Sequence, residues 1–341
     1  MTIHFVLPGG VDDPTSPSGG NVYDRRVIQS LGKLGTDVRE ITITGSWPQP
    51  DDTARSRLHQ ALTGIEDGAV VLLDGLVACG VPEVVVPHAG RLRLVVLVHL
   101  PLADETGLPP AVAARLEAAE RECLHAARAV VATSPWAARR LAEHHGLAEV
   151  HAVTPGTDPA PLATGTDGVS RLLCVASLTP RKGHDVLVEA LATVTDLPWT
   201  CAFVGPERSG HPVRELIARH GLGDRIELVG PLTGDPLDRA YAAADLFVLP
   251  SRAETYGMVV TEALARGVPV MASCVPDALG DGGLLLPPGD VTAFARALRR
   301  WLTDEDWRRD LRDRALKRRH ELSTWDETAA QLARVPASLR P

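Results

Sequence analysis

The chain has 341 residues, of which 45% are hydrophobic and 23% charged, and its formal net charge is −8 at pH 7. This length allows two domains of ordinary size, and the composition is typical of a globular protein in water. The acidic balance argues against a protein that coats nucleic acid, and it favours a small-molecule site or a neutral partner.

The five cysteines are widely spaced and include no Cys-x-x-Cys pair. We therefore expect reduced, mostly buried thiols and a cytoplasmic protein. The opening residues TIHFVLP predict a first strand and not a signal peptide. No apolar run approaches the roughly 18–20 residues that a membrane span requires.

Short, near-continuous apolar runs separated by longer amphipathic segments predict strands that are buried on both faces of a sheet and that alternate with helices. In the first half, the predicted strands are 3–8, 38–44, 69–75, 92–100, 129–134 and 149–155. Residues 154–170 are rich in Pro, Gly and Thr and predict a linker. In the second half, the predicted strands are 171–177, 199–205, 226–230, 245–251, 268–273 and 282–288. Two doubly wound parallel sheets follow from this alternation.

Three helices have clear signals. Val186, Leu187, Ala190, Leu191 and Val194 recur at helical spacing, as do Phe294, Leu298, Trp301 and Leu302, which follow an N-cap at Asp290. The final segment, residues 322–335, is amphipathic, with Trp325, Ala329 and Leu332 on one face and a cap at Ser323 or Thr324.

Two carboxylates, Glu254 and Glu262, lie eight positions apart. The first follows a predicted strand, and the second belongs to a predicted helix from Gly257 to Arg266. A helix start offers free N–H groups to a phosphate, and eight helical residues would separate the carboxylates by about 12 Å. One carboxylate could hold a hexose and the other a ribose, with a diphosphate between them; solvated surface glutamates are the alternative.

The segment PSRAETYGMVVTEALARGVPV resembles the Glu-x7-Glu segment of the family-4 retaining glycosyltransferases, which have the GT-B fold. Four further segments resemble parts of the same family: SPSGGNVYDRRVIQSLGKLG, TPGTD, VASLTPRKGHDVLVEAL and LGDGGLLLPPGD. The resemblance covers nearly the whole chain. It implies two Rossmann-like domains that face a cleft, with an acceptor-binding domain at 1–155, a nucleotide-sugar domain at 156–320 and a C-terminal helix at 321–341 that packs back on the first domain.

The resemblance also implies roles for residues of the second domain. Glu254 would hold hydroxyls of the donor sugar, Glu262 would bind the donor ribose and Lys182 would neutralise the diphosphate. Backbone N–H groups near the sugar and phosphates would come from Gly257, Met258 and Val259.

In the first domain, the resemblance implies that Gly19 and Gly20 form a loop whose amide closes onto the phosphate. His99 would approach the donor sugar, although a histidine after a strand is often structural. Asp104 and Glu105 either face the acceptor or are ordinary surface acids.

One departure from the family concerns the diphosphate. Where the family has an arginine, this chain has Ser177, and Arg181 stands beside Lys182. Either Lys182 carries most of the remaining positive charge on the diphosphate, or Arg181 replaces the missing guanidinium. A second departure is a shortened loop in ASCVPDALGD.

The expected reaction is retaining transfer of a hexose from a UDP-sugar, or a GDP-sugar, to the hydroxyl of a small-molecule, glycan or lipid-linked acceptor. No metal and no other cofactor is expected, because basic groups and helix N-termini take the role of a divalent ion in the family. Nucleic acid is not an expected partner, whereas peripheral membrane contact and the oligomeric state stay open. The alternatives are a sugar-nucleotide 2-epimerase and a non-catalytic nucleotide-sugar-binding protein. An NAD enzyme is disfavoured, because Gly19 and Gly20 lack the third spaced glycine of a dinucleotide fingerprint.

Overall fold

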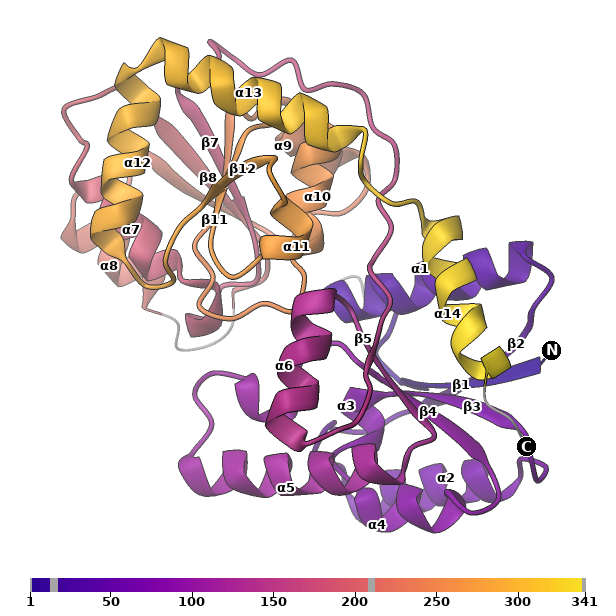
Figure 1. Cartoon of the computed structure of the whole chain (residues 1–341). Coiled ribbons are helices and arrows are strands. Elements are labelled where there is room, and N and C mark those ends of the chain that lie inside the picture. Colours follow the sequence, from indigo (N-terminus) through magenta and orange to yellow (C-terminus); the bar gives the residue numbers. More distant parts are fainter. Residues whose placement is uncertain (1, 13–17, 208–211, 339–341) are drawn as a thin grey trace. The chain divides into compact units, whose positions relative to one another are not determined.

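The computed structural model describes residues 2–12, 18–207 and 212–338. They form two compact units (Figure 1). The N-terminal unit contains the described residues up to Gly156 together with the segment from Ser323 onward, and the C-terminal unit contains Thr157–Leu322. The chain therefore leaves the first unit once, completes the second and returns.

The N-terminal unit is built on a parallel six-stranded sheet in the order β2-β1-β3-β4-β5-β6. Its strands are β1 (Thr2–Pro8), β2 (Asp37–Ile43), β3 (Val70–Asp74), β4 (Arg93–Val98), β5 (Ala129–Ala132) and β6 (His151–Ala152). Its helices are α1 (Gly19–Lys33), α2 (Asp52–Thr63), α3 (Gly75–Ala78), α4 (Pro82–Val85), α5 (Pro110–Ala126), α6 (Pro135–His145) and α14 (Trp325–Ser338), with short 3₁₀ turns at Val86–His88 and Leu102–Asp104.

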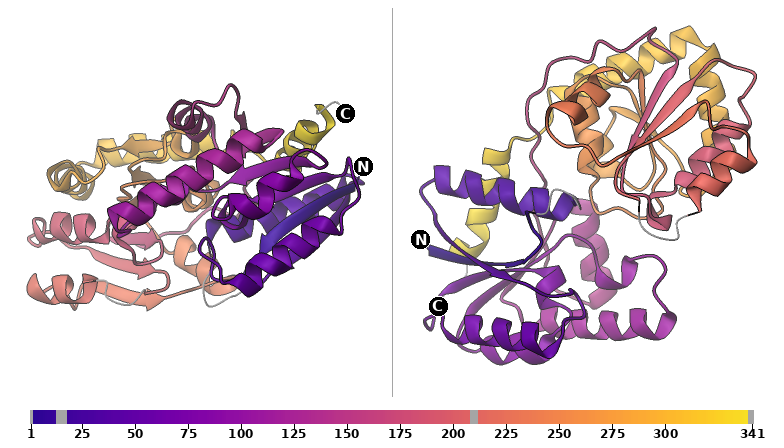
Figure 2. Two further views of the ribbon diagram at one scale, coloured as in Figure 1. Left: turned by 90° about the horizontal axis from the view of Figure 1, so that it is seen from below. Right: turned by 180° about the vertical axis from the view of Figure 1, so that it is seen from behind.

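The C-terminal unit is built on a second parallel six-stranded sheet, in the order β12-β11-β10-β7-β8-β9. Its strands are β7 (Arg171–Val175), β8 (Thr200–Val204), β9 (Ile226–Gly230), β10 (Leu246–Leu249), β11 (Val270–Ala272) and β12 (Gly283–Leu285). Its helices are α7 (His184–Ala192), α8 (Val213–Arg219), α9 (Asp235–Ala242), α10 (Met258–Ala265), α11 (Pro276–Leu279), α12 (Val291–Thr303) and α13 (Glu305–Arg319), with a 3₁₀ turn at Pro180–Lys182. Helices cover both faces of this sheet (Figure 2).

The predicted fold class is confirmed, and each predicted strand is present. The expectation that every strand is buried on both faces is wrong at the sheet edges. β2 is largely exposed and β9 only half-buried, because an edge strand has a neighbour on one side alone. The five cysteines are free and four of them are buried, as expected.

The final helix, α14, packs on α1 within the N-terminal unit. Trp325, Ala329 and Leu332 are buried, as the predicted apolar face requires. Thr324 caps the helix through a reciprocal pair: its hydroxyl accepts from the N–H of Glu327, whose carboxylate accepts from the N–H of Thr324.

The strand orders locate one special point in each sheet. In a doubly wound sheet, ligands bind outside the carboxyl ends of the strands where the winding direction reverses. In the N-terminal unit this point lies between β1 and β3, and in the C-terminal unit it lies between β7 and β10. Among the helices of the described residues, none combines the length and apolarity that a bilayer span requires.

Candidate functional site

The loops that follow β7 and β10 are joined to one another at the reversal point of the C-terminal sheet. The N–H of Arg252 donates to the carbonyl of Arg181 at 2.7 Å. Gly183 has φ of +68°, and a Cβ built on it would lie 2.1 Å from the carbonyl oxygen of Pro250. Only a glycine fits this close approach without strain, so Gly183 allows the two loops to pack against one another.

Glu254 is held within these joined loops by two cations and a hydroxyl. Lys182 Nζ lies 2.5 Å from Glu254 Oε1, and Arg181 Nη1 lies 3.7 Å from Oε2. The hydroxyl of Ser251 donates to Oε1 at 2.7 Å. Burial alone would raise the pKa of Glu254, but the charges of Lys182 and Arg181 outweigh burial and hold the pKa below its usual value. Glu254 is therefore a buried anion, and the solvated alternative is wrong for it.

The helix α10 starts just after this cluster. Gly257 is its N-cap, with φ of +92° and no side-chain cap. Met258 and Val259 form its first turn, where the N–H groups have no partner within the helix. The separation of about 12 Å between Glu254 and Glu262 assumed helix throughout. That assumption is wrong, since the helix begins only at Met258.

Glu262 lies on α10 and is oriented by a tyrosine. The hydroxyl of Tyr241 donates to Glu262 Oε2 at 2.8 Å, and the guanidinium of Arg266 lies over the tyrosine ring at 4.9 Å. Burial raises the pKa of Glu262, and the Tyr241 hydrogen bond and the Arg266 charge oppose this rise. One carboxylate oxygen is thus engaged by Tyr241.

Ser177 lies just beyond β7 and is half-buried. Its carbonyl accepts from the N–H of Thr179 at 2.8 Å. Arg181, by contrast, points at the Glu254 loop, where its Nη1 also donates to the carbonyl of Ala253 at 3.2 Å. The guanidinium at this site therefore comes from position 181 and not from position 177.

In the N-terminal unit, the start of α1 lies against His99. Ser18 caps the helix by accepting from the N–H of Asn21, and Gly19 and Gly20 form its first turn. A Cβ built on Gly20 would lie 3.1 Å from the His99 ring. The small residue thus allows close contact between the helix start and the imidazole.

His99 also contacts a buried carboxylate that sequence reasoning did not single out. Its Nε2 lies 2.8 Å from Asp24 Oδ1, and Asp24 is fully buried. Within the described residues, Asp24, Asp74 and His99 form a group whose possible ligand atoms lie within 4.8 Å of one another. His99 Nε2 is already hydrogen-bonded to Asp24, and this contact is an ion pair when the imidazole is protonated.

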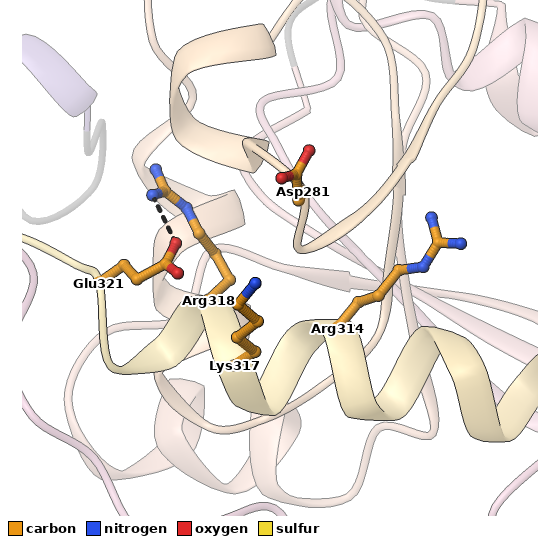
Figure 3. Close-up of a pocket in the computed structure, with 5 residues that line it drawn as sticks. All are labelled: Asp281, Arg314, Lys317, Arg318 and Glu321. Carbon is orange, nitrogen blue, oxygen red and sulfur yellow. Dashed lines mark hydrogen bonds and ion pairs between the residues drawn. The ribbon is translucent and has the colours of Figure 1, made fainter.

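A cavity of about 200 Å³ lies elsewhere in the C-terminal unit, between α13 and the turn before β12 (Figure 3). Arg318 contacts Glu321 and donates to the carbonyl of Asp277 at 2.8 Å. Arg314 pairs with Asp310 at 2.7 Å. Because Arg318 links α13 to α11 and Arg314 pairs within α13, these guanidinium groups have structural partners, and we do not place the functional site there.

Comparison with known proteins concerns the C-terminal unit above all. Residues 169–304 match the family model described as glycosyl transferases group 1. This segment, called here the group 1 domain, is similar to the members of that family. It contains Glu254, Glu262, Lys182 and both loops of the site.

Relatives and solved structures agree with this similarity. The D-inositol 3-phosphate glycosyltransferase of Salinispora tropica is 36% identical over 177 residues, which cover 47% of this chain and 36% of that protein. The chain thus spans about a third of the length of that curated relative. Sucrose-phosphate synthase from Thermosynechococcus elongatus has a TM-score of 0.77 at 22% identity, with 97% of this chain and 98% of that chain covered. HepE of Anabaena in complex with UDP-glucose has a TM-score of 0.75 at 19% identity, with 99% and 100% covered. The chain has the GT-B fold that these structures share.

The group 1 domain brings together Arg181, Lys182 and Glu254, with Gly257 three residues beyond. Sequence reasoning missed Ser251 and Tyr241 in this domain and Asp24 and Asp74 in the other unit. An acid at the end of an apolar strand, such as Asp74 after VVLL, was the available signal. Asp104, considered for the acceptor, forms a two-contact pair with Arg140.

Proposed function

We propose that this protein is a retaining glycosyltransferase that moves a hexose from a nucleoside diphosphate sugar, with UDP favoured, to an acceptor hydroxyl. The observation that carries the proposal is the cluster of Glu254, Lys182 and Arg181 within the group 1 domain. It lies at the carboxyl ends of β7 and β10, where a doubly wound sheet binds its ligand.

The charges of the cluster suit the two ends of such a donor. Glu254 is anionic, so it accepts hydrogen bonds from vicinal hydroxyls of the sugar. Lys182 uses one of the three N–H donors of its ammonium on Glu254 and retains two for phosphate oxygens. Arg181 and the N-terminus of α10 add positive charge for the diphosphate.

The reaction follows from this division of charge. The bond from the anomeric carbon to the diphosphate breaks while Lys182 and Arg181 stabilise the negative charge that develops on the leaving group. The acceptor hydroxyl attacks from the same face, and the leaving phosphate takes its proton. Glu254 positions the sugar and does not form a covalent bond in this scheme. The configuration of the anomeric carbon is then retained.

Glu262 is proposed to bind the ribose of the donor. Tyr241 holds one of its oxygens, and the other accepts from a ribose hydroxyl. UDP is favoured as the nucleotide. The structure of HepE in complex with UDP-glucose, which has a similar fold, supports this choice. The N-terminal unit is proposed to hold the acceptor, and a divalent metal is not required.

Ligand-induced stabilisation tests the proposal first. We expect UDP and UDP-hexoses to raise the unfolding temperature, because a ligand at about 100 times its dissociation constant adds roughly 2.7 kcal/mol of stability. Slow release of free sugar from the same donor, with its anomeric configuration followed by NMR, then reports turnover without a known acceptor.

A matched pair of variants completes the test. Glu254→Gln should reduce sugar release about 10²–10³-fold, whereas Glu227→Gln, at an exposed carboxylate of β9 in the same unit, should leave it unchanged. A protein that no nucleoside diphosphate or sugar nucleotide stabilises would refute the proposal. Accumulation of an epimerised sugar nucleotide would assign the site to an epimerase instead.

A further inference from the structure

His99 has a charged environment that comes from three separate elements of the N-terminal unit. It follows β4 directly, Asp24 comes from α1 and Asp74 is the last residue of β3. β3 and β4 are neighbours in register, with Asp74 paired to Leu97, so the imidazole and this carboxyl group emerge at the same edge of the sheet.

Both carboxyl groups are removed from solvent. Asp24 is 0% exposed and Asp74 is 2% exposed, while the His99 side chain is 16% exposed. Asp24 Oδ1 contacts His99 Nε2 at 2.8 Å, and its Oδ2 is buried without a hydrogen-bond partner in the described part of the chain. Asp74 Oδ1 accepts from the N–H of Leu76 at 2.7 Å.

A buried anion is costly unless a cation lies beside it. His99 is the cation that the geometry supplies to Asp24. We propose that Asp24 and Asp74 keep His99 as an imidazolium, so that His99 meets its ligand as a fixed cation and hydrogen-bond donor and not as a proton acceptor. Asp24 acts through direct contact, and Asp74 is a positioning residue that adds negative charge near the imidazole.

The electrostatics agree with this geometry. Burial by itself would lower the pKa of His99, but the charge of Asp24, the hydrogen bond to it and the charge of Asp74 raise the pKa to about 9. Burial, and next the charge of Asp24, raise the pKa of Asp74 to about 7. As the pH rises, Asp74 therefore loses its proton near pH 7, and His99 loses its own only near pH 9. Tyr23 packs edge-on to the imidazole at 5.2 Å, and burial raises its pKa well above the usual value, so it stays neutral.

The consequence for the reaction rests on the proposed function. The imidazolium lies beside Gly20, at the positive N-terminal end of α1. Such a cation stabilises an anionic or hydroxyl oxygen of a ligand that the N-terminal unit binds. An imidazolium cannot take the proton of the hydroxyl that attacks the sugar. In the proposed reaction, the departing phosphate then receives that proton.

Side-chain NMR of the imidazole nitrogens tests the proposal without any substrate. His99 is assigned by the signal lost in His99→Asn. In the unaltered protein, its titration should fall well above 6.5, near 9. Asp24→Asn should lower the midpoint by about 1–3 pH units, since it removes an opposite charge in contact. Asp74→Asn should lower it by less, because only Asp24 has a direct hydrogen bond with the imidazole in the described residues.

The control is a carboxylate that pairs with a different histidine. Glu117 lies 3.1 Å from His144 on the surface of the same unit, so Glu117→Gln should leave the His99 midpoint unchanged. A His99 midpoint at or below 6.5 in the unaltered protein would overturn the proposal, as would a titration that Zn²⁺ abolishes by binding the three side chains. A low midpoint in the unaltered protein refutes the proposal whether or not the variants fold.

The proposed function and the inference about His99 can be refuted independently of one another. If His99 titrates near 9 and Asp24→Asn lowers that midpoint, while no sugar nucleotide binds or turns over, the inference stands and the function falls. If a sugar nucleotide turns over, the fall in activity at alkaline pH should move to lower pH in Asp24→Asn. Turnover with a pH profile that Asp24→Asn leaves unmoved would overturn the inference and leave the function standing.

Discussion

Replacement of Lys182 by methionine should destabilise the group 1 domain through Glu254. The ammonium and the carboxylate lie 2.5 Å apart, and their side chains are 16% and 7% exposed. Lys182→Met keeps most of the aliphatic stem and removes the charge. The carboxylate of Glu254 then stays buried with less compensation.

The size of the effect follows from what remains around Glu254. Removal of one partner from a buried ion pair costs about 3–5 kcal/mol. Arg181 still lies 3.7 Å from Oε2, and the Ser251 hydroxyl still donates to Oε1. We therefore expect the lower end, a loss of about 3 kcal/mol in the free energy of unfolding at pH 7. The double variant Lys182→Met/Glu254→Gln should recover part of this loss, because it leaves no unpaired charge.

The loss should depend on pH in a known direction. The folded-state pKa of Glu254 lies below its unfolded value of 4.5. Its contribution to stability is therefore complete above pH 4.5 and disappears as the pH falls through the folded value. The difference between the variant and the parent should be full at pH 7 and should close as the pH falls below 4.5 and through the folded-state pKa.

Urea unfolding measures this difference, with buried Trp199 and Trp301 as fluorescent reporters in the C-terminal unit. The matched control is Arg214→Met, at an exposed cation paired with Glu207 in the same unit, which should change stability by less than about 0.5 kcal/mol. A Lys182→Met loss below about 1 kcal/mol at pH 7 would be typical of an exposed pair. That result, or a loss of equal size at acid pH, would refute the reasoning.

Four further outcomes are expected. Glu254→Gln should reduce turnover about 10²–10³-fold and leave UDP affinity nearly unchanged, as kinetics and calorimetry together would reveal. Glu262→Gln should weaken UDP binding by about 1.5–3 kcal/mol, and Tyr241→Phe should weaken it by less; calorimetry with unchanged affinity in Glu262→Gln would exclude the ribose role. Arg181→Ala should damage turnover about as much as Lys182→Ala, since a guanidinium can bind phosphate with two parallel hydrogen bonds; full activity in both would place the diphosphate elsewhere. Turnover should persist in excess EDTA, and its loss with recovery on added Mg²⁺ or Mn²⁺ would contradict metal independence.

The strands could be predicted from the sequence because burial leaves a local mark. A run such as VVLL or LFVL is apolar along its whole length only where both faces of a sheet are covered. The order of the strands in the sheet has no comparable pattern in the local sequence. That β10 lies beside β7, and β1 beside β3, depends on crossover packing over long stretches of chain. The reversal points, and hence the places where site residues converge, became visible only in the structure.

The same limit explains which site residues were found. Two segments resemble a known family clearly enough to be recognised from the sequence. One contains Glu254 and Glu262, and the other contains Lys182. Tyr241 is 21 residues from Glu262, and His99 is 75 residues from Asp24. Contacts at such separations depend on register and helix placement. A carboxylate in an amphipathic helix, as Asp24 is in α1, looks from the sequence like an ordinary polar position.

Each unit surrounds one ionisable side chain with groups of opposite charge, and the sign differs between the two units. In the group 1 domain, two cations keep the buried Glu254 anionic. In the other unit, two carboxyl groups are proposed to keep the partly buried His99 cationic. In each case the ionised group lies at the carboxyl ends of central strands, on backbone fixed by the sheet. Charges held in this way need no reorganisation when a ligand arrives, which is the condition under which electrostatic stabilisation is most effective. Neither group is then available to exchange a proton near neutral pH. A transfer in which the leaving phosphate itself accepts the proton is therefore the chemistry that this distribution of charge favours.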